Sequence, residues 1–427
     1  MRWRRWVLGA AVCVAVALGA PTLLDRAGSV SRDARPGTGT AEQVERGRLL
    51  ALAGNCATCH TARGGASYAG GRAIGTPFGP VYATNLTPDV DTGLGRWSSE
   101  HFWRALHEGR GYDGQRLVPV FPYTEFTRLT RADSDALYAY LRTLPAVQQR
   151  NRAHELAWPY GTQTALAAWR LAFFRAGSWQ DDAGKSAEWN RGAYLVNGAG
   201  HCVACHGGRN ALGATADAGF GGGLIPTRNW YAPAFTRAKE GSVADWPLDD
   251  IVALLRDGVA ARGRASGPMA EVVAGSTQHL PVADLHAMAV YLKSLPVEDV
   301  PAAAPGEQPQ PAVRELGAKL YGDHCAGCHG DSGEGGAIPN GPLVVPALAA
   351  NRLVTMDPPA NLVRAIALGG FGAATVANPR PFGMPPFAHV LNDEQIAAVA
   401  TYLRSSWGAR AAPVKAFDVA RFRGGQE

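Results

Sequence analysis

Apolar and polar positions along the 427-residue chain first single out an apolar run near the N-terminus. The run covers residues 7–20, follows three arginines within the first five residues, and ends in Gly19 and Ala20. A basic start, an apolar middle and small residues at the end are typical of a secretory signal peptide. Residues 1–24 are therefore predicted to be a signal peptide or a retained N-terminal anchor, and the rest of the chain is expected to be exported.

Beyond this run, the pattern predicts pairs of helices that recur three times in the same order. Each copy has a first helix with a glycine and a terminal helix that ends in Tyr-Leu and a basic residue. A small glycine lets two helices cross closely. The glycines are Gly47, Gly192 and Gly317, and the terminal helices end at Arg142, Lys293 and Arg404. The predicted starts of the terminal helices are Thr130 with Asp133, Pro281 with Asp284, and Asn392 with Gln395.

Between the two helices of each copy the sequence contains Cys-x-x-Cys-His, the attachment pattern of c-type haem. Two thiols about one helical turn apart can reach the two vinyl groups of a porphyrin, and the next histidine can bind the iron. Zinc half-sites and redox dithiols share the cysteine spacing, but the chain has no second ligand pair near each motif, and the flanks are helical. Three covalently bound haem c groups are therefore predicted. The cysteines are Cys56, Cys59, Cys202, Cys205, Cys325 and Cys328, and the histidines are His60, His206 and His329.

The repeat predicts an all-α fold of three tandem cytochrome c-type domains. The expected domains are residues 41–148, 185–297 and 312–409, with a connector at 149–184, a proline-rich linker at 298–311 and a tail at 410–427. The remaining segments are rich in glycine and proline and are expected to be loops that wrap a haem rather than strands. The connector carries an apolar stripe at Trp169, Phe173 and Phe174. Packing of this stripe against the second domain is favoured over docking on a partner or a membrane.

Methionine positions indicate the sixth iron ligands of two of the three haems. Met384 follows His329 by 55 residues and Met269 follows His206 by 63, each shortly before a terminal helix. Methionine opposite histidine is usual for low-spin electron-transfer haems. Met288 and Met356 are expected to pack in the interior.

The first domain contains no methionine, and Phe121 stands 61 residues after His60, where a ligand is expected. Phenylalanine cannot bind iron. Haem one is therefore either five-coordinate or bound by an unusual ligand, for which the sequence offers His101, His107 and His154.

Composition limits the function classes. The chain has 41 Lys plus Arg and 36 Asp plus Glu, and without the three N-terminal arginines the balance is 38 to 36. A chain this balanced has no basic field for nucleic acid. The mean hydropathy of −0.10 argues against a protein with several membrane spans.

Three further segments carry a resemblance to a known family: residues 75–89, 191–206 and 267–280. With them, roughly residues 41–407 resemble the triple-haem cytochrome c subunits of bacterial membrane-bound dehydrogenases for alcohol, gluconate, fructose, sorbitol and aldehyde. The resemblance implies the periplasmic side of the cytoplasmic membrane. It also implies a large catalytic subunit with PQQ, flavin or molybdopterin, a small third subunit as a further candidate partner, and ubiquinone or a terminal oxidase as acceptor. Many members have methionine where this chain has Phe121, and a subset has Phe-Pro-Tyr there.

The sequence thus predicts an electron-transfer subunit without catalytic residues of its own, serving donors that carry CH–OH or aldehyde groups. Asn85 and Thr87 are expected to support a loop of the haem pocket. The alternative is a multihaem enzyme or ligand sensor with an open coordination site at haem one.

Overall fold

The computed structural model describes residues 39–216, 219–298, 308–337 and 343–425. The predicted signal peptide or anchor and most of the predicted linker lie outside the described residues. Contacts divide the chain into two compact units, which are described separately. Unit 1 contains the described residues up to 185 together with 194–204 and 210–214, and unit 2 contains the remainder.

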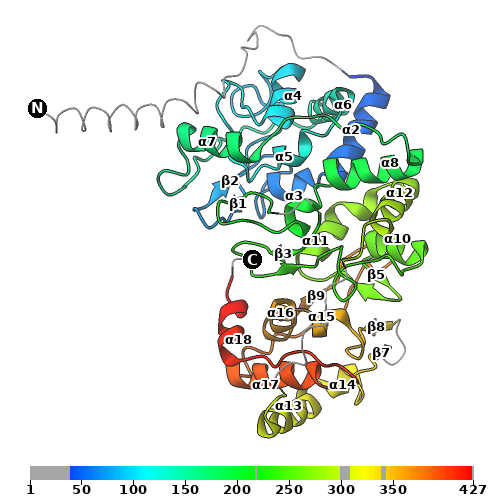
Figure 1. Ribbon diagram of the computed structural model, residues 1–427. Helices are drawn as coiled ribbons and strands as arrows, with labels where there is room; N and C mark the ends of the chain where they lie inside the picture. The colour runs from blue at the N-terminus through cyan, green and yellow to red at the C-terminus, as the bar shows by residue number, and fades with distance from the viewer. Residues whose placement is uncertain (1–38, 217–218, 299–307, 338–342, 426–427) are drawn as a thin grey trace, which may run out of the picture. The chain divides into compact units, whose positions relative to one another are not determined.

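Unit 1 is built from helices joined by long loops (Figure 1). Its first helix begins at Thr40, whose side chain forms a capping box with Gln43, and α4 begins in the same way with Ser98 and His101. The elements of unit 1 are α2 Ala41–Ala53, α3 Cys56–His60, β1 Ala73–Ile74, β2 Val81–Tyr82, α4 Ser99–Glu108, α5 Tyr123–Phe126, α6 Arg131–Leu141, α7 Gln163–Phe173 and η1 Leu195–Ala199.

Unit 2 repeats this organisation over its longer stretch of chain. Its helices are α10 Leu248–Asp257, α11 Pro268–Gly275, η2 Thr277–His279, α12 Val282–Lys293, α13 Pro311–His324, α14 Ala326–His329, α15 Arg352–Thr355, α16 Ala360–Leu368, α17 Asp393–Arg404 and α18 Ala416–Arg423. Its strands are β3 Gly223–Leu224, β4 Tyr231–Ala232, β5 Val259–Ala260, β6 Gly263–Arg264, β7 Gly336–Ala337, β8 Leu343–Val345, β9 Gly370–Phe371 and β10 Gly383–Met384. Two further helices, α8 Ala187–Tyr194 and α9 Val203–His206, have residues in both units.

The predicted close crossing of first and terminal helices is confirmed in all three copies. The crossing pairs are α2 with α6, α8 with α12 and α13 with α17; the last pair lies side by side in Figure 1. In each, a Cβ on the glycine would overlap a backbone oxygen of the terminal helix, so only glycine fits. A Cβ placed on Gly47 would lie 1.9 Å from the Ala136 oxygen, one on Gly192 would lie 1.9 Å from that of Ala287, and one on Gly317 would lie 2.2 Å from that of Ala398.

An ion pair accompanies two of these crossings. Arg46 Nε lies 2.5 Å from Asp133 Oδ1, and Arg191 Nη2 lies 2.8 Å from Asp284 Oδ2. Both aspartates stand three residues after the N-cap of their helix. In the third copy Gln395 occupies this position and closes a capping box with Asn392. The predicted starts of the terminal helices are therefore confirmed. The third residue after the N-cap forms an ion pair with the first helix in two copies and closes a capping box in the third.

The loops between the helices contain short strands, which the glycine and proline content did not predict. Each strand is two or three residues long, and the strands form antiparallel pairs: β1 with β2, β3 with β4, β5 with β6, β7 with β8, and β9 with β10. Such pairs satisfy backbone donors and acceptors where glycine and proline prevent a helix. The described part of the chain is nevertheless mainly helical.

Within unit 2, the segment around Tyr231 is joined to α16. The backbone N–H of Tyr231 donates to Asn361 Oδ1 at 2.8 Å, and Asn361 Nδ2 donates back to the Tyr231 oxygen at 2.8 Å. Both residues are buried. Arg364, also buried, donates to the backbone oxygens of Phe422 and Gly424, so α16 additionally holds the C-terminal residues.

The apolar stripe of the connector packs differently from the expectation. The Phe174 ring lies 4.9 Å from the Tyr123 ring at a near-perpendicular angle, so Phe174 packs within the predicted first domain. Trp169 donates a hydrogen bond to the Leu212 oxygen, and Phe173 remains 39% exposed. The expectation that the stripe packs against the second domain is therefore wrong for Phe174. Trp169 contacts the predicted second domain through the Leu212 oxygen, and Phe173 stays partly exposed.

Among the described residues, no helix has the length and apolar character needed to cross a membrane.

Substitution of Gly317 by alanine tests the helix crossing. We expect a loss of about 1–3 kcal/mol in the free energy of unfolding, because the added methyl group overlaps the backbone of α17. Gly322→Ala, on an open face of the same helix with nothing within 4 Å, is the matched control. It should gain about 0.5–1 kcal/mol from helix propensity. Urea unfolding of the full chain followed by circular dichroism compares them, and equal midpoints would contradict the proposed crossing constraint.

Candidate haem sites

Each Cys-x-x-Cys-His motif forms or enters a short helix. The first motif is α3, and the second and third motifs end α9 and α14. In every motif the first cysteine is partly buried and the second is exposed. The two thiols are therefore presented about one helical turn apart, with the histidine directly after them.

The motif histidines share one hydrogen bond. In each, Nδ1 contacts a backbone carbonyl oxygen just beyond the short strand pair that follows the motif. The distances are 2.6 Å from His60 to Thr84, 2.8 Å from His206 to Pro233, and 3.1 Å from His329 to Pro346. Because a carbonyl only accepts, Nδ1 must carry the proton, and Nε2 keeps the lone pair that binds iron.

A second contact holds the same histidines through their backbone. A glycine N–H donates to the histidine oxygen in all three copies, and each glycine has a positive φ. The bonds are 2.7 Å from Gly70 to His60, 2.8 Å from Gly222 to His206, and 2.9 Å from Gly335 to His329. We call the two contacts together the histidine clamp.

The clamp leaves no room for a side chain at its glycine. A Cβ at Gly335 would lie 2.6 Å from the backbone nitrogen of Ala347, the residue after Pro346. A Cβ at Gly70 or Gly222 would lie 2.5 Å or 2.7 Å, respectively, from the backbone of the corresponding segment. In each copy the clamp glycine therefore packs directly against the segment whose carbonyl oxygen accepts the hydrogen bond from the histidine ring. The sequence analysis did not identify these glycines, because they follow their histidines at unequal spacings of 10, 16 and 6 residues.

Burial favours the neutral, iron-binding form of the histidines. Desolvation lowers the pKa of His206 to about 4, against a smaller opposing effect of the Pro233 carbonyl. It also lowers the pKa of His60 and of His329. Neutral imidazole with an oriented Nε2 is the form that ligates a metal, so these residues fit a haem iron.

The loops before Phe121 and Met269 have matching backbone contacts. In unit 1 the Leu117 N–H donates to the oxygen of Gly109, the C-cap of α4, at 2.9 Å. In unit 2 the Ala265 N–H donates to the oxygen of Gly258, the C-cap of α10, also at 2.9 Å. Phe121 follows the first contact by four residues and Met269 follows the second by four. Phe121 thus occupies the position that corresponds to Met269.

The four methionines among the described residues lie in apolar surroundings. Met384 pairs with Gly370 across β10 and β9, and packs against the same apolar cluster as Cys325. Met269 lies at the start of α11 and packs against Ala265, Ala270 and Val273. Met288 and Met356 are buried, as expected of interior side chains.

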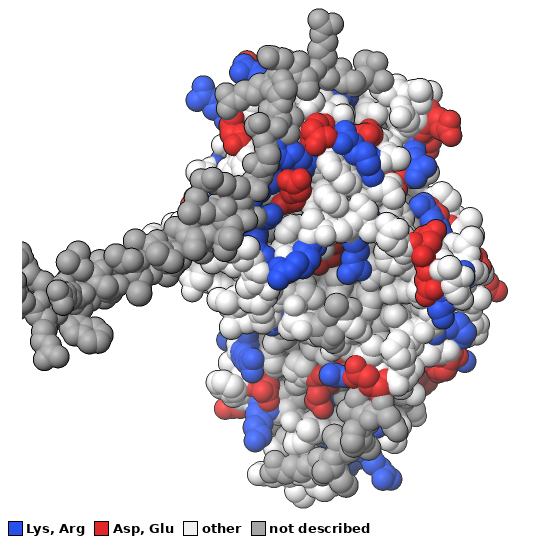
Figure 2. Space-filling model, turned by 45° about the horizontal axis from the view of Figure 1, so that its top comes forward, with Lys and Arg blue, Asp and Glu red and all other residues white. Residues whose placement is uncertain are grey.

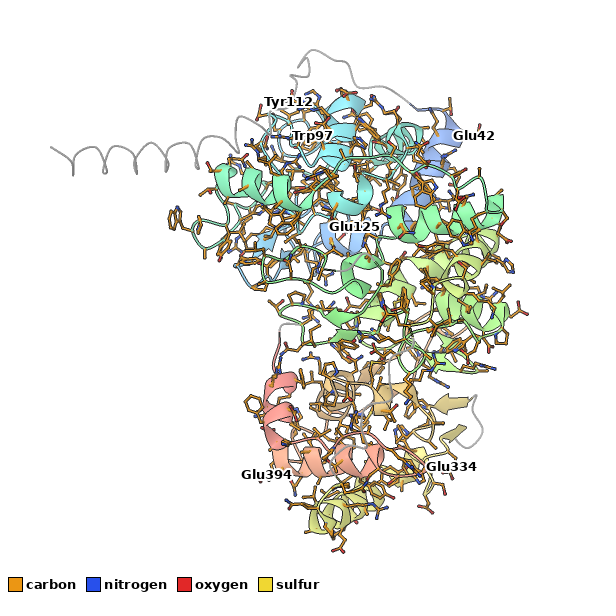
Figure 3. The ribbon with its side chains drawn as sticks, in the orientation of Figure 1. Glu42, Trp97, Tyr112, Glu125, Glu334 and Glu394 are labelled. Carbon is orange, nitrogen blue, oxygen red and sulfur yellow. The ribbon has the colours of Figure 1, made fainter. Side chains whose placement is uncertain are left out.

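The histidines offered as ligands for haem one have structural partners. His101 is buried, caps α4 through Ser98, and stacks on Tyr112 at 4.5 Å; Figure 3 labels Tyr112 and its neighbour Trp97. His107 Nδ1 contacts the Thr127 oxygen at 2.9 Å. These contacts match the usual behaviour of histidines in and beside helices.

His154 also has a structural partner: its Nδ1 accepts a hydrogen bond from the backbone N–H of Tyr82. Nothing in these contacts distinguishes any of the three histidines as a ligand of haem one.

Asn85 and Thr87 form a buried support for the loop after β2. Asn85 Nδ2 donates to the Val147 oxygen at 2.8 Å, and the Thr87 hydroxyl donates to Asn85 Oδ1 at 2.7 Å. Asn85 directly follows Thr84, whose carbonyl binds His60. The pair therefore holds the first histidine clamp in place.

Charges of both signs are interspersed on the face shown in Figure 2. No single-sign field covers that face. This agrees with the near balance of acidic and basic residues in the sequence.

Replacing Gly335 by alanine tests the third clamp. We expect a loss of about 1–3 kcal/mol in the free energy of unfolding, from the positive φ and the overlap with Ala347. Gly336→Ala, where nothing lies within 4 Å, should change it by less than about 0.5 kcal/mol. Urea unfolding of the full chain provides the comparison. If both variants unfold alike, the clamp does not constrain the site.

The first and third motifs lie within segments that match a protein-family model. The family model for Cytochrome c matches residues 44–145 and 314–407. The chain is 41% identical to one of the subunits of nicotinate dehydrogenase from Pseudomonas putida over 383 residues, covering 88% of this chain and 31% of that protein. The chain thus spans about a third of that relative's length.

Two relatives of similar size match over most of both chains. The cytochrome c subunit of alcohol dehydrogenase (quinone) from Gluconacetobacter polyoxogenes is 37% identical, over 89% of this chain and 84% of that protein. The gluconate 2-dehydrogenase cytochrome c subunit of Pantoea cypripedii is 35% identical, over 89% of each. Cytochrome c domains imply covalently bound haem c. The chain therefore belongs to the cytochrome c subunits of dehydrogenase complexes, which transfer electrons and are not the catalytic subunits.

Proposed function

We propose that this chain is a triple-haem cytochrome c. In this role it takes electrons from a dehydrogenase catalytic subunit and passes them to ubiquinone or another component of the respiratory chain. The proposed location is the periplasmic side of the cytoplasmic membrane, reached through the N-terminal signal. The three domains are residues 41–148, 185–297 and 312–409.

The observation that carries the proposal is the threefold occurrence of the histidine clamp. The family model matches two segments, whereas the clamp around His206 lies outside both of them. Its ring contact, its backbone contact and its positive-φ glycine agree with the other two. Identical support for a third histidine, directly after a third cysteine pair, favours three haems over two.

In this assignment the six motif cysteines form the thioether bonds and His60, His206 and His329 bind iron. Met269 and Met384 are the sixth ligands of haems two and three. Haem iron supplies reversible one-electron exchange when bound. The polypeptide orients each Nε2 through Nδ1, excludes water with its apolar clusters, and sets the potentials through ligand type and burial.

The donor is proposed to be a large subunit with PQQ, flavin or molybdopterin, accompanied in some complexes by a small third subunit. Alcohol and gluconate, in the names of two relatives, are CH–OH donors. The name of a third relative, nicotinate dehydrogenase, adds an aromatic nitrogen heterocycle. The proposed substrate classes are therefore alcohols, aldehydes and sugar acids, with N-heteroaromatic acids as a second class.

Haem counting tests the proposal. The exported chain should contain three haems, measured by the pyridine haemochrome spectrum against protein mass. Cys325→Ala/Cys328→Ala should retain two, because the third haem loses both thioether bonds. Gly327→Ala, between the same cysteines with nothing within 4 Å, should retain three. Two haems in the unaltered chain would contradict the proposed count.

The second candidate function rests on Phe121, which stands where Met269 stands in the next copy. A haem without a sixth ligand binds small molecules, and the chain would then be a haem enzyme or a ligand sensor. Carbon monoxide binding to one haem of three, together with peroxide turnover, would support this function. Carbon monoxide binding without turnover leaves the chain an electron carrier with one open site.

A further inference from the structure

The first two cysteine motifs are entered through the same backbone turn. Before each motif a helix ends in a glycine, Gly54 after α2 and Gly200 after η1. The next residue has a positive φ, 48° at Asn55 and 38° at His201, and its N–H donates to the carbonyl oxygen three residues back. In the third copy Cys325 directly follows α13, so the turn is a feature shared by the first two motifs.

The side chains at the two turns have different partners. Asn55 stays within its own motif, where its Oδ1 accepts a hydrogen bond from the Thr58 hydroxyl at 2.5 Å. The His201 imidazole contacts the other motif, with Nε2 at 3.2 Å from the backbone oxygen of Gly54. Because a carbonyl oxygen only accepts, Nε2 carries the proton and donates it. The residue before Cys202 is therefore hydrogen-bonded to the segment that leads into motif one.

The two turns are in contact through their backbones as well. Gly54 is buried, and a Cβ placed on it would lie 3.4 Å from the oxygen of Ala199, the last residue of η1. η1 also contacts α5. Residues 194–204 belong to unit 1 together with α2 and α5, although they were predicted in the second domain. The entry to motif two is thus built into the unit that contains motif one.

The His201 ring is also held by an aromatic side chain of α5. It lies 5.4 Å from the Phe126 ring, edge to face at an interplanar angle of 76°. The Phe126 ring is buried and lies 5.6 Å from the ring of Phe121. Phe121 stands where a sixth ligand of haem one is expected. Three rings in contact therefore join that position to the residue before Cys202, and the Phe126 ring fixes the orientation of the imidazole.

His201 thus lies where the two attachment motifs come together. Electron exchange between two redox groups slows steeply as their separation grows, because the electronic coupling decays with distance. Covalent bonds and hydrogen bonds transmit this coupling better than an open gap does. The contact from His201 to Gly54 supplies such a connection two residues before Cys56 and one residue before Cys202.

We propose that His201 is a positioning residue that fixes motif two against motif one and thereby sets the rate of electron exchange between haems one and two. One electron passes between the two irons, so one iron is oxidised as the other is reduced, and no proton or co-reactant takes part. His201 itself keeps its oxidation state and holds the two turns together through the Gly54 oxygen. This inference rests on the proposed function, because it requires a haem at each of the two motifs.

Flash reduction of the full chain with its haems tests the proposal. A photoreductant supplies the electron, and transient absorption follows haem one separately, because its spectrum lacks the contribution of a methionine ligand. His201→Asn should slow the exchange with haem one at least severalfold. Asparagine suits the turn, as Asn55 does in motif one, but its side chain is too short to reach the Gly54 oxygen. The haem count and the midpoint potentials should stay unchanged.

Two further variants separate the hydrogen bond from a general effect of substitution. His201→Gln, whose Nε2 can still donate to the Gly54 oxygen, should retain more of the rate than His201→Asn. His324→Asn is the matched control, because His324 precedes Cys325 as His201 precedes Cys202 and is exposed. It should leave the rate unchanged.

An unchanged rate in His201→Asn would overturn the proposal, as would equal slowing in His324→Asn. A slower rate that a shifted midpoint potential accounts for would also overturn it, since the residue would then act on the driving force. The proposed function fails differently. Two haems in the unaltered chain, or no exchange between its haems, would contradict that function, whereas three haems with equal exchange in every variant would overturn only the role of His201.

Discussion

The hydrogen bond from each motif histidine to a backbone carbonyl is the interaction on which the three sites depend. Cysteines tether a porphyrin but do not decide which histidine nitrogen meets the iron. The carbonyl does, because it accepts the Nδ1 proton and leaves Nε2 with its lone pair. The strand pair after each motif brings that carbonyl into place, and the positive-φ glycine holds the strand pair against the motif. For His60, the buried amide of Asn85 adds a further support on the same loop.

Beside these clamps, the first and terminal helices of each copy cross so closely that their backbones are in contact at the glycine. Glycine at each crossing is required by packing, whereas Arg46 and Arg191 add ion pairs that the third copy lacks. The reciprocal bonds between Tyr231 and Asn361 join the strand next to the second clamp to α16. Unit 2 therefore contains two histidine clamps within one continuous packing arrangement.

Much of this was predictable from the sequence, and the failures have physical reasons. The terminal helices followed from Thr130 and Asn392, since capping is a local interaction. Cytochrome c domains followed from the cysteine motifs, because covalent chemistry imposes their spacing. The clamp glycines were missed, because they act across loops of unequal length. The strand pairs were missed as well, since glycine and proline obscure such short ladders. Phe174 was placed wrongly because its partner, Tyr123, is distant in sequence and had no visible pattern.

The first copy has no methionine at the expected position of the sixth ligand. Phe121 stands where Met269 stands, while the clamp around His60 is intact. Near-infrared magnetic circular dichroism of the oxidised full chain tests the whole account most directly, because it reports methionine–iron bonds separately from other ligands. The account predicts a methionine–iron band with the intensity of two haems out of three, from Met269 and Met384. An intensity equal to three haems, or to one, would contradict it.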